Sequence, residues 1–596
     1  MQKTDQMIDQ TTQATINRWL EGDFDSATKA EINRLKQEDP EGLIDAFYTH
    51  LDFGTGGLRG IMGVGTNRMN NYTVRSATSG LANYLLKQPA HERVIVGYDS
   101  RLHSRDFAIE TARVLAAAGI KVLLYRELRP VPFVSFGVLE KKCAAGVMIT
   151  ASHNPPEYNG YKVYWDYGGQ VLPPHDQGII DEVKKIKDPT TIEMVDFPHP
   201  LIEEVGEEMD VAYLKRTHSL MFHPGDNLSK GEELKVVYTP LHGTGMTVVP
   251  KALKDWGFTN CTLVEEQAAP DGNFPTIKSP NPEEHDALTI GIKKLETVEG
   301  DLLIATDADA DRIGVVVRTK RGPIFLNGNE VAVLSIEHIC QALTQTHEMP
   351  PKPAFIKSIV TTELFSKIAE HYKTTCYDLL TGFKYFGEKI HEWLIEETKT
   401  KALHIPYHHF IFGAEESYGY LLGTHARDKD AIIAANLICE MALHQKLQGK
   451  TLIEALYEIY KKYGVYRERL ASLTFEGKEG VSKMKEMMLA LREKPPKEIG
   501  GIPVEIVEDY LSHTKTYLNS GHREPILLPQ SDVLRFWLVD ETKVVIRPSG
   551  TEPKIKLYCG VKKTGSFFDE TTINETITAC EKQTDDVIAF VKKLIL

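Results

Sequence analysis

Ser152 and His153 follow directly after a short and continuously apolar run, residues 144–149. Such a run predicts a buried strand. The turn formers Asn154 and Pro155 predict that the strand ends in an exposed loop, which would leave the Ser152 hydroxyl free. A hydroxyl in this position can carry a phosphoryl group or act as a nucleophile. A hydroxyl that only stabilises the turn is the alternative interpretation.

Three carboxylates, those of Asp307, Asp309 and Asp311, stand at alternate positions after a second apolar run. In an extended segment alternate side chains point the same way, so their mutual repulsion calls for a cation. A calcium EF-hand is excluded, because Arg312 and Arg318 occupy the positions that need glycine and glutamate. An oxygen-only site suits Mg²⁺. A solvated acidic turn is the alternative.

Two further loops carry groups that suit a phosphorylated sugar. The loop that begins at Arg547 offers positive charge, hydroxyl donors and a glycine-loosened backbone, which suit a dianionic phosphate; an ordinary hairpin loop is the alternative. Glu415 and Ser417 lie between two glycines and could accept and donate hydrogen bonds to vicinal hydroxyls; an acidic helix N-terminus is the alternative. Arg59, in a glycine-rich segment, could meet a phosphate or belong to a flexible loop.

The elements that must position these loops repeat one pattern three times. A buried strand, a polar turn and a helix are followed by a second and a third strand; the first strands are residues 94–96, 236–238 and 355–360. This alternation predicts right-handed crossovers in α/β units. Ligands in open α/β sheets bind outside the carboxyl ends of the strands, so the polar loops after the third strands are predicted to converge.

The predicted fold class is α/β, with three related α/β domains and a smaller C-terminal α+β domain around a central cleft. The predicted boundaries are a helical N-terminal extension (1–48), a domain with the serine loop (49–210), one with the acidic loop (211–325), one with the Glu415 loop (326–465), and a linker with the C-terminal domain (466–596).

Charge and hydropathy exclude several classes of protein. The formal net charge of −14 disfavours a general nucleic-acid binder. Residues 1–15 lack the apolar core of a signal peptide, and no apolar run approaches the ~20 residues that cross a bilayer. The seven cysteines show no C-x-x-C spacing, so we expect reduced core residues. We therefore expect a cytoplasmic protein with no nucleic-acid or membrane partner; the oligomeric state is not predicted.

The loops together describe one reaction. A phosphate-carrying serine, a divalent ion, a reader of sugar hydroxyls and a phosphate clamp suit movement of a phosphoryl group between two hydroxyls of one sugar. The motifs TASHNP (150–155), DADADR (307–312), GAEESYG (413–419) and RPSGTEP (547–553) resemble those of the α-D-phosphohexomutase superfamily, in its order and at its spacings. The resemblance covers nearly the whole chain beyond the N-terminal extension.

The resemblance implies a role for each motif residue. Ser152 would be phosphorylated in the active enzyme, and its phosphate would hold Mg²⁺ together with Asp307, Asp309 and Asp311. Arg312 would lie beside that site. Sugar hydroxyls would bind Glu415 and Ser417, and the non-reacting phosphate would bind Arg547, Ser549, Gly550 and Thr551. The catalytic or substrate-contacting shell would also include Arg59, His153, Lys162, Thr381 and Lys429. Which of His153, Lys162 and Lys429 is general base or acid is left open.

The implied activity is interconversion of glucose 1-phosphate and glucose 6-phosphate, with glucose 1,6-bisphosphate as intermediate and activator. Chain length resembles the longer phosphoglucomutase branch, whose relatives include phosphopentomutases, and Glu416-Ser417-Tyr418 points to glucose. Phosphopentomutase or phosphomannomutase activity stays open, as does a non-catalytic protein that binds small sugar phosphates. A serine hydrolase lacks a G-x-S-x-G elbow and leaves the aspartates unexplained.

Overall fold

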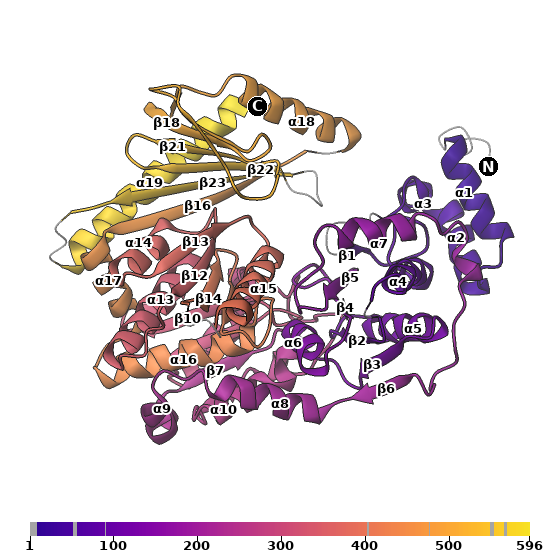
Figure 1. The fold of residues 1–596 in the computed structure, drawn as a ribbon, viewed down its shortest axis with the longest axis horizontal. Helices are drawn as coiled ribbons and strands as arrows, with labels where there is room; N and C mark the ends of the chain where they lie inside the picture. Colours follow the sequence, from indigo (N-terminus) through magenta and orange to yellow (C-terminus); the bar gives the residue numbers. More distant parts are fainter. Residues whose placement is uncertain are drawn as a thin grey trace. The chain divides into compact units, whose positions relative to one another are not determined.

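The computed structural model describes residues 9–51, 57–89, 91–401, 405–475, 477–548, 554–565 and 569–595 (Figure 1). The chain divides into two compact units. The first comprises Met1–Phe325, Phe386–Ile395 and Gly419–Leu443, and the second comprises Leu326–Tyr385, Glu396–Tyr418 and His444–Leu596.

The first unit begins with three helices: α1 (Gln10–Glu21), α2 (Ser26–Glu38) and α3 (Pro40–Phe47). Asp9 and Asp25 start the first two, because their carboxylates accept hydrogen bonds from backbone N–H groups of the first turn. Trp19 stacks on Phe24, and both contact Tyr72. These aromatic contacts join the helices to the sheet domain that follows.

A six-stranded sheet comes next, in the order β1-β5-β4-β2-β3-β6. Its strands are β1 (Gly57–Ile61), β2 (Arg93–Tyr98), β3 (Lys121–Tyr125), β4 (Ala145–Ile149), β5 (Tyr158–Trp165) and β6 (Ile202–Val205). Its helices are α4 (Asn71–Leu85), α5 (Ser104–Ala117), α6 (Val131–Lys141) and α7 (His175–Val183). Strands β2, β3, β4 and β6 run parallel, and β5 pairs antiparallel with both β4 and β1.

Side chains of β2 alternate between the two faces of this sheet. Val94 and Val96 lie in the core formed with α4 and α5, while Ile95 faces Gly137 of α6. Figure 1 shows α4 and α5 on one face and α6 on the other. A strand buried on both faces needs a continuous apolar run, which is what residues 94–96 provide.

The second sheet of this unit has the order β11-β10-β9-β7-β8. Its strands are β7 (Val236–Thr239), β8 (Cys261–Leu263), β9 (Leu302–Thr306), β10 (Ile313–Thr319) and β11 (Gly322–Leu326). The helices are α8 (Glu207–His218), α9 (Pro224–Lys230), α10 (Val249–Asp255), α11 (Glu265–Ala268) and α12 (Thr289–Thr297). Strand β9 ends at Thr306 and pairs antiparallel with β10. The acidic segment is therefore the turn between these two strands.

The second unit holds β12 (Pro353–Ser358) between its parallel neighbours β13 (Thr375–Leu379) and β14 (His409–Glu415). Helices α13 (Gly328–Gln345), α14 (Glu363–His371) and α17 (Leu452–Tyr463) belong to it, and α15 (Phe383–Thr400) and α16 (Ala431–Leu447) carry residues of both units. Strand β15 (Gly419–Leu422) precedes α16 in the first unit. The sequence therefore runs between the two units several times.

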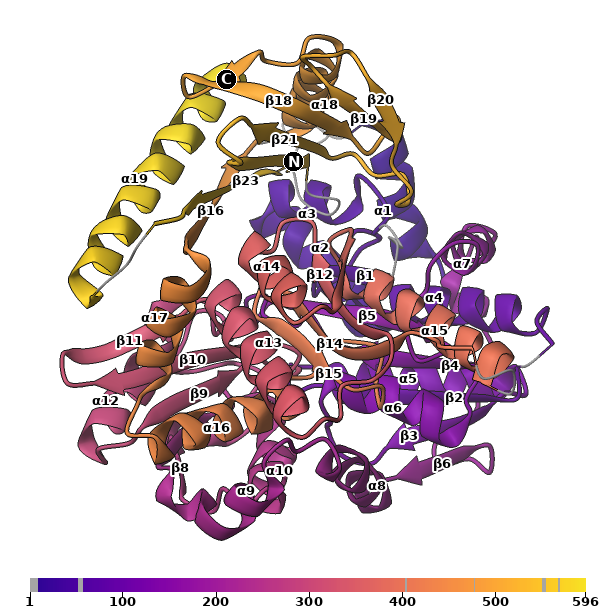
Figure 2. The same ribbon diagram turned by 60° about the vertical axis from the view of Figure 1, so that its left-hand side comes forward.

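An antiparallel sheet, β16-β23-β22-β21-β18-β19-β20 with β17 paired to β18, ends the second unit. Its strands are β16 (Val465–Thr474), β17 (Glu498–Ile499), β18 (Ile502–Asp509), β19 (Thr514–Tyr517), β20 (Arg523–Pro525), β21 (Leu534–Leu538), β22 (Lys543–Pro548) and β23 (Lys554–Lys563). Helix α18 (Gly477–Glu493) precedes β17, and α19 (Glu570–Ile595) packs along β16 and β23 (Figure 2).

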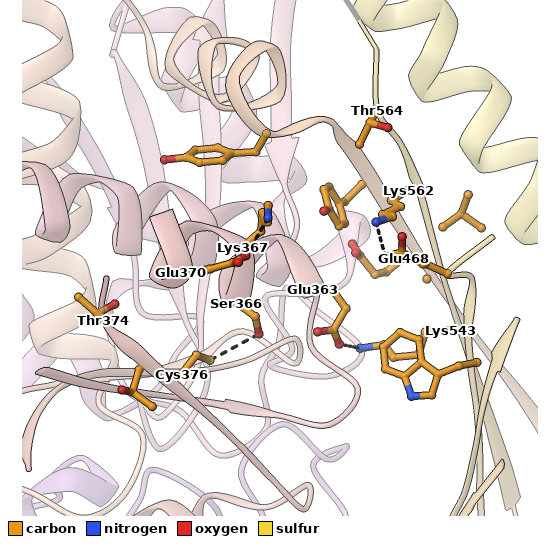
Figure 3. A pocket seen from close by; sticks show the side chains of 17 residues that line it. Glu363, Ser366, Lys367, Glu370, Thr374, Cys376, Glu468, Lys543, Lys562 and Thr564 are labelled. Carbon is orange, nitrogen blue, oxygen red and sulfur yellow. Dashed lines mark hydrogen bonds and ion pairs between the residues drawn. The ribbon is translucent and has the colours of Figure 1, made fainter. Parts of the chain in front are cut away.

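A set of buried and half-buried charges connects this sheet with β12, β13 and α14. We call it the ion-pair network; its members are Lys357, Glu363, Asp378, Glu508, Arg535 and Lys543. Lys357 Nζ lies 3.1 Å from Glu363 and 2.9 Å from Asp378, and Lys543 Nζ lies 2.6 Å from Glu363. Glu363 and Lys543 also line a cavity of about 710 Å³ (Figure 3).

The predicted fold class is confirmed: three α/β sheets and a β-rich C-terminal domain with two helices are present. Strands β5 and β10, which return after the serine and acidic loops, were not predicted. The domain boundaries stay predictions. Among the described helices, none is both long and apolar enough to cross a bilayer.

Candidate active site

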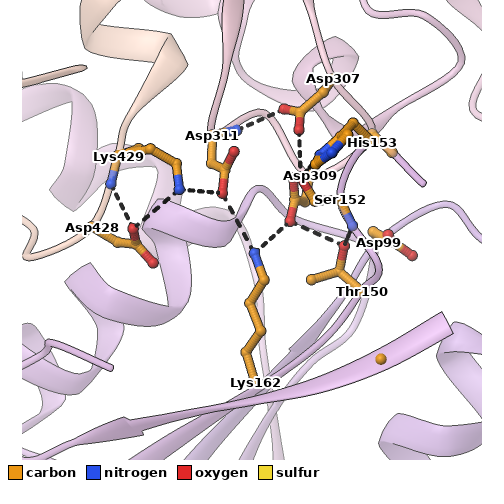
Figure 4. A network of polar contacts seen from close by, with 12 residues as sticks. Asp99, Thr150, Ser152, His153, Lys162, Asp307, Asp309, Asp311, Asp428 and Lys429 are labelled. Atoms are coloured by element: carbon orange, nitrogen blue, oxygen red, sulfur yellow. Dashed lines mark hydrogen bonds and ion pairs between the residues drawn. The ribbon is translucent and has the colours of Figure 1, made fainter. Parts of the chain in front are cut away.

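The loop of residues 150–158, here called the Ser152 loop, joins β4 to β5 in the first unit. Ser152 is only 3% exposed and has a left-handed φ of 52°. Its backbone N–H donates to Thr150 Oγ1 (2.8 Å), and its hydroxyl donates to Asp307 Oδ2 (2.8 Å). The prediction of an exposed, free hydroxyl was wrong, because the acidic segment after β9 packs against the loop (Figure 4).

Asp307, Asp309 and Asp311, the acidic triad, are buried, and a ligand oxygen from each lies within 4.8 Å of the others. Two of their buried oxygens, Asp309 Oδ1 and Asp311 Oδ1, have no hydrogen-bond partner among the described residues. The Arg312 Nε lies 3.9 Å from Asp311 Oδ1, too far for a hydrogen bond. Buried acceptors left unpaired are costly. An oxygen-only set with two such atoms fits Mg²⁺.

Two lysines offset part of the negative charge of the triad (Figure 4). Lys162 Nζ, on β5, lies 2.9 Å from Asp309 and 3.4 Å from Asp311, and Lys429 Nζ lies 3.1 Å from Asp311. Burial alone would lower the pKa of Lys162, but these two carboxylates raise it above its ordinary value. Burial and the neighbouring aspartates raise the pKa of Asp307 well above its usual range. Arg312 adds a third cation beside Asp311 but also pairs with Glu283, so four carboxylates meet three cations and a negative excess remains.

Three other predicted residues lie close to the Ser152 loop. His153 Nδ1 is 3.2 Å from Ser152 Oγ, and burial, followed by the charges of Arg312 and Arg59, lowers the pKa of this imidazole well below its ordinary value. Arg59, on β1, donates to Asn154 Oδ1 at 3.0 Å. Arg312 forms an ion pair with Glu283. The first unit thus brings Arg59, Ser152, His153, Lys162, Arg312, Lys429 and the acidic triad together.

In the second unit, hydrogen bonds link two of the other predicted loops. Glu415 Oε1 accepts from the backbone N–H of Gly382 at 2.7 Å, and the neighbouring Thr381 accepts from Arg547. Ser417 is half-buried two residues after Glu415. Residues Ser549, Gly550 and Thr551 lie outside the described residues.

Glu416, which the sequence analysis took as part of a glucose signature, contacts its own unit. Its Oε2 accepts from Ser358 Oγ (3.0 Å) and Thr361 Oγ1 (3.3 Å), and its backbone N–H donates to Thr361 Oγ1 (3.2 Å). Tyr418 has a left-handed φ of 65°. These bonds fix the backbone that presents Glu415.

Sequence reasoning missed residues that hold the site from behind. Thr150 Oγ1 donates to Asp309 Oδ2 (3.0 Å) while it accepts from the Ser152 backbone, so one hydroxyl connects the two loops. Asp428 Oδ2 accepts from Tyr164 (2.7 Å) next to Lys429. Arg101 donates to backbone carbonyls of the Ser152 loop. The signal for Arg101 was its polar turn at the carboxyl end of β2, the neighbour of β4.

Comparison with family models gives three matches along the chain. They are the phosphoglucomutase/phosphomannomutase α/β/α domains I (residues 50–190), II (212–322) and III (327–463). The chain is 38% identical to a phosphoglucomutase of Staphylococcus haemolyticus over 517 residues, which cover 86% of this chain and 90% of that protein. A Staphylococcus aureus phosphoglucomutase is 36% identical and covers 92% of this chain and 96% of its own length.

Solved structures agree on the fold. A phosphoglucomutase/phosphomannomutase family protein from Burkholderia thailandensis has a TM-score of 0.61 at 18% identity, covering 89% of this chain and 97% of that one. The open form of the Paramecium phosphoglucomutase parafusin has a TM-score of 0.65 at 17% identity, covering 90% and 95%. The relatives and the three domain matches confirm the resemblance drawn from the motifs: the chain is an enzyme of the phosphoglucomutase/phosphomannomutase family, the α-D-phosphohexomutases.

Proposed function

We propose that this phosphoglucomutase interconverts glucose 1-phosphate and glucose 6-phosphate through a phosphate carried on Ser152. The observation that supports this most is the bond from the Ser152 hydroxyl to Asp307, within a triad that keeps two buried oxygens unpaired. A hydroxyl at the edge of a site that fits Mg²⁺ suits a group that carries phosphate.

Ser152 phosphate, Asp307, Asp309 and Asp311 would hold the Mg²⁺. When bound, the ion would neutralise charge on the phosphoryl group. Lys162 would add a fixed positive charge, because two aspartates keep it protonated. Lys429 would add a second positive charge beside Asp311.

The transfer has two halves. The bond between phosphorus and Ser152 Oγ breaks as the O6 hydroxyl of glucose 1-phosphate bonds to phosphorus; the O6 proton passes to a base, and Ser152 Oγ takes up a proton. The resulting glucose 1,6-bisphosphate then turns over, and the bond between phosphorus and O1 breaks as Ser152 Oγ bonds to phosphorus, with O1 taking up a proton to give glucose 6-phosphate. His153 Nδ1, 3.2 Å from that oxygen, can hold the serine proton in the second half. Glucose 1,6-bisphosphate would therefore also activate dephosphorylated enzyme.

The second unit would bind the part of the substrate that does not react. Glu415 and Ser417 would accept and donate hydrogen bonds to sugar hydroxyls, with Thr381 beside them. The phosphate clamp would consist of Arg547, Ser549, Gly550 and Thr551. That these groups face Ser152 across one cleft stays a prediction from the sequence, as do a cytoplasmic location and small sugar phosphates as the partners.

The alternative functions are a serine hydrolase, a non-catalytic binding protein and a mutase for another sugar. A serine hydrolase is disfavoured, because the Ser152 hydroxyl donates to Asp307 rather than to a His–Asp pair. A non-catalytic binding protein would need no phosphate carrier. Phosphomannomutase and phosphopentomutase activity share the same chemistry at Ser152, so the substrate test separates them.

The test is a ³¹P NMR time course with equal amounts of glucose, mannose and ribose 1-phosphates, Mg²⁺ and trace glucose 1,6-bisphosphate. Glucose 6-phosphate should form first. Intact mass should show a fraction heavier by one phosphate that Ser152→Ala lacks, and this variant should lose at least about 10⁴-fold in kcat. Ser335→Ala, at a buried serine of α13 that donates to the carbonyl of Val331, is the control and should keep both properties. Absence of conversion of any sugar by folded protein would refute the proposal.

A further inference from the structure

Arg101 follows β2, and its guanidinium lies behind the Ser152 loop. Nη1 donates to the carbonyl oxygens of Pro155 (2.7 Å) and Tyr158 (3.0 Å). Nη2 donates to the carbonyl oxygens of Ser152 (2.6 Å) and Asn154. One side chain thus binds three carbonyl groups of the loop, which has no strand pairing there, and the carbonyl of Tyr158, where β5 begins.

Arg101 is itself held rigidly. It is 3% exposed, its backbone N–H donates to Asp99 Oδ1 at 2.9 Å, and its Nε lies 3.4 Å from Asp99 Oδ2. Asp99 Oδ1 also accepts from Ser104 Oγ at 2.6 Å, at the start of α5. On the other side the guanidinium lies 5.2 Å from the ring of Phe274.

The second sheet domain packs onto the same turn. A Cβ added to Gly272 would lie 2.3 Å from the backbone nitrogen of Leu102 and 2.7 Å from the carbonyl carbon of Arg101. Real Cβ atoms do not approach backbone so closely, so glycine is required here. Arg101 is therefore held between its own sheet, the Ser152 loop and the segment that carries Phe274.

The loop needs such a support because its conformation is not self-sustaining. Ser152 has a left-handed φ of 52°, which a residue with a side chain adopts only when its surroundings enforce it. Carbonyl groups turned into the protein also need donors. A planar guanidinium supplies several donors in a fixed fork, whereas an ammonium group is a single point of attachment.

We propose that Arg101 is a positioning residue for phosphoryl transfer, which fixes the backbone of the Ser152 loop so that Ser152 Oγ faces the acidic triad. This inference rests on the proposed function. Arg101 contacts carbonyl oxygens rather than the reacting atoms, so it acts through the placement of Oγ. Because a displacement of about 1 Å can cost about 10²-fold in rate, its loss should affect turnover more than substrate binding.

The experiment uses the full chain with Arg101→Ala, Arg101→Lys and the control Arg113→Ala. Arg113 also donates to a backbone carbonyl, that of Val195 (2.7 Å), and pairs with Glu110, but it contacts no part of the Ser152 loop. The measurements are kcat and KM for glucose 1-phosphate, the rate at which glucose 1,6-bisphosphate phosphorylates Ser152, and thermal unfolding. Guanidinium ion is added to the alanine variant at concentrations below those that unfold the protein.

Arg101→Ala should lower kcat and the phosphorylation rate by about 10²-fold or more, with a smaller change in KM, and guanidinium should restore part of the rate. Arg101→Lys should keep the fold and still lose about tenfold or more, since one ammonium cannot bond four carbonyls. Arg113→Ala should leave both rates near those of the unchanged chain. If Arg101→Ala does not fold, the kcat and the phosphorylation rate of Arg101→Lys test the proposal instead.

The positioning role would be overturned if Arg101→Ala or Arg101→Lys kept both kcat and the phosphorylation rate within about twofold of the unchanged chain. A variant that changed only KM would also overturn it. Unchanged protein that takes no phosphate on Ser152 would instead refute the proposed function, and the positioning role with it. The two failures are therefore distinguishable.

Discussion

The acidic triad of the first unit is buried and the ion-pair network of the second is partly buried, and their charges are balanced differently. In the network, Glu363 meets Lys357 and Lys543, and Asp378 meets Lys357 and Arg535. In the triad, three carboxylates meet two lysines, and two buried oxygens stay without a hydrogen bond. We therefore expect the network to contribute to the fold, and the triad, with its two unpaired oxygens, to bind a cation.

The carboxyl pKa values of the network and of the triad are also shifted differently. Burial would raise the pKa of Glu363, but Lys357 and Lys543 hold it well below its usual range. Burial also raises the pKa of Asp307, and there the neighbouring aspartates add to the effect. In the network the pKa values of Glu363 and Asp378 are both lowered, whereas in the triad Lys429 and Lys162 lower the pKa of Asp311 but that of Asp307 stays raised.

Removal of one charge from the triad should have the largest effect on activity. Asp307→Asn keeps an acceptor for the backbone N–H groups of Asp311 and Arg312 but replaces an oxygen that would bind the ion. We expect kcat to fall by about 10³-fold, since a metal supplies several kcal/mol of charge stabilisation. In chelator, thermal stability should stay equal or rise, because a like charge is gone.

The measurement is kcat together with thermal unfolding in EDTA and in Mg²⁺. The stabilisation by Mg²⁺ should disappear in Asp307→Asn and persist in the control Asp286→Asn, an exposed acid of the same domain. Lower stability of Asp307→Asn in EDTA would show that the triad is as structural as the network.

The network should respond in the opposite way, in stability rather than turnover. Lys357→Met removes a fully buried ammonium from between Glu363 and Asp378, and we expect a loss of about 3 kcal/mol in the free energy of unfolding. The kcat of the folded enzyme should change little. Urea titration measures the loss. Lys367→Met, which breaks an exposed pair with Glu370, should change stability by less than about 0.5 kcal/mol; equal losses in both variants would contradict the comparison.

Low pH should also reduce the stability that the network provides, by less than Lys357→Met does. The pKa values of Glu363 and Asp378 are lowered in the folded state, so the unfolded chain takes up these protons at higher pH. Their stabilisation is therefore present above the ordinary carboxyl pKa of about 4 and is lost as pH falls toward the folded values. Urea titrations between about pH 6 and pH 3 should show this slope, and it should be shallower in Glu363→Gln. An identical slope in that variant would exclude a contribution from Glu363.

Much of the fold could be predicted because its parallel strands are buried on both faces. Continuous apolar runs predicted β4, β9 and β14, and the polar loops behind them carry the site. The return strand β5 escaped prediction because it mixes aromatic residues with Asn159 and Lys162, both of which are buried. Polar residues of β5 face the site and its supports, and they are not exposed to water.

The types of the site residues could be predicted, but their burial and supports could not. Ser152 was expected to be exposed, since nothing near it in the sequence shows that the segment after β9 covers it. Arg101 binds backbone carbonyls, which every residue has, so its partners leave no mark in the sequence. Contacts to backbone from a distant side chain become visible only in three dimensions.

The burial of Ser152 also limits which catalysts could add a phosphate to its hydroxyl. A protein kinase or phosphatase must place the target residue in its own cleft, which needs an accessible and extended segment. Ser152 is 3% exposed, and the carbonyls of its loop are bound by Arg101. Only a small molecule can reach it without unfolding the loop. On the proposed mechanism, a phosphate on Ser152 would therefore come from a sugar bisphosphate rather than from a protein kinase.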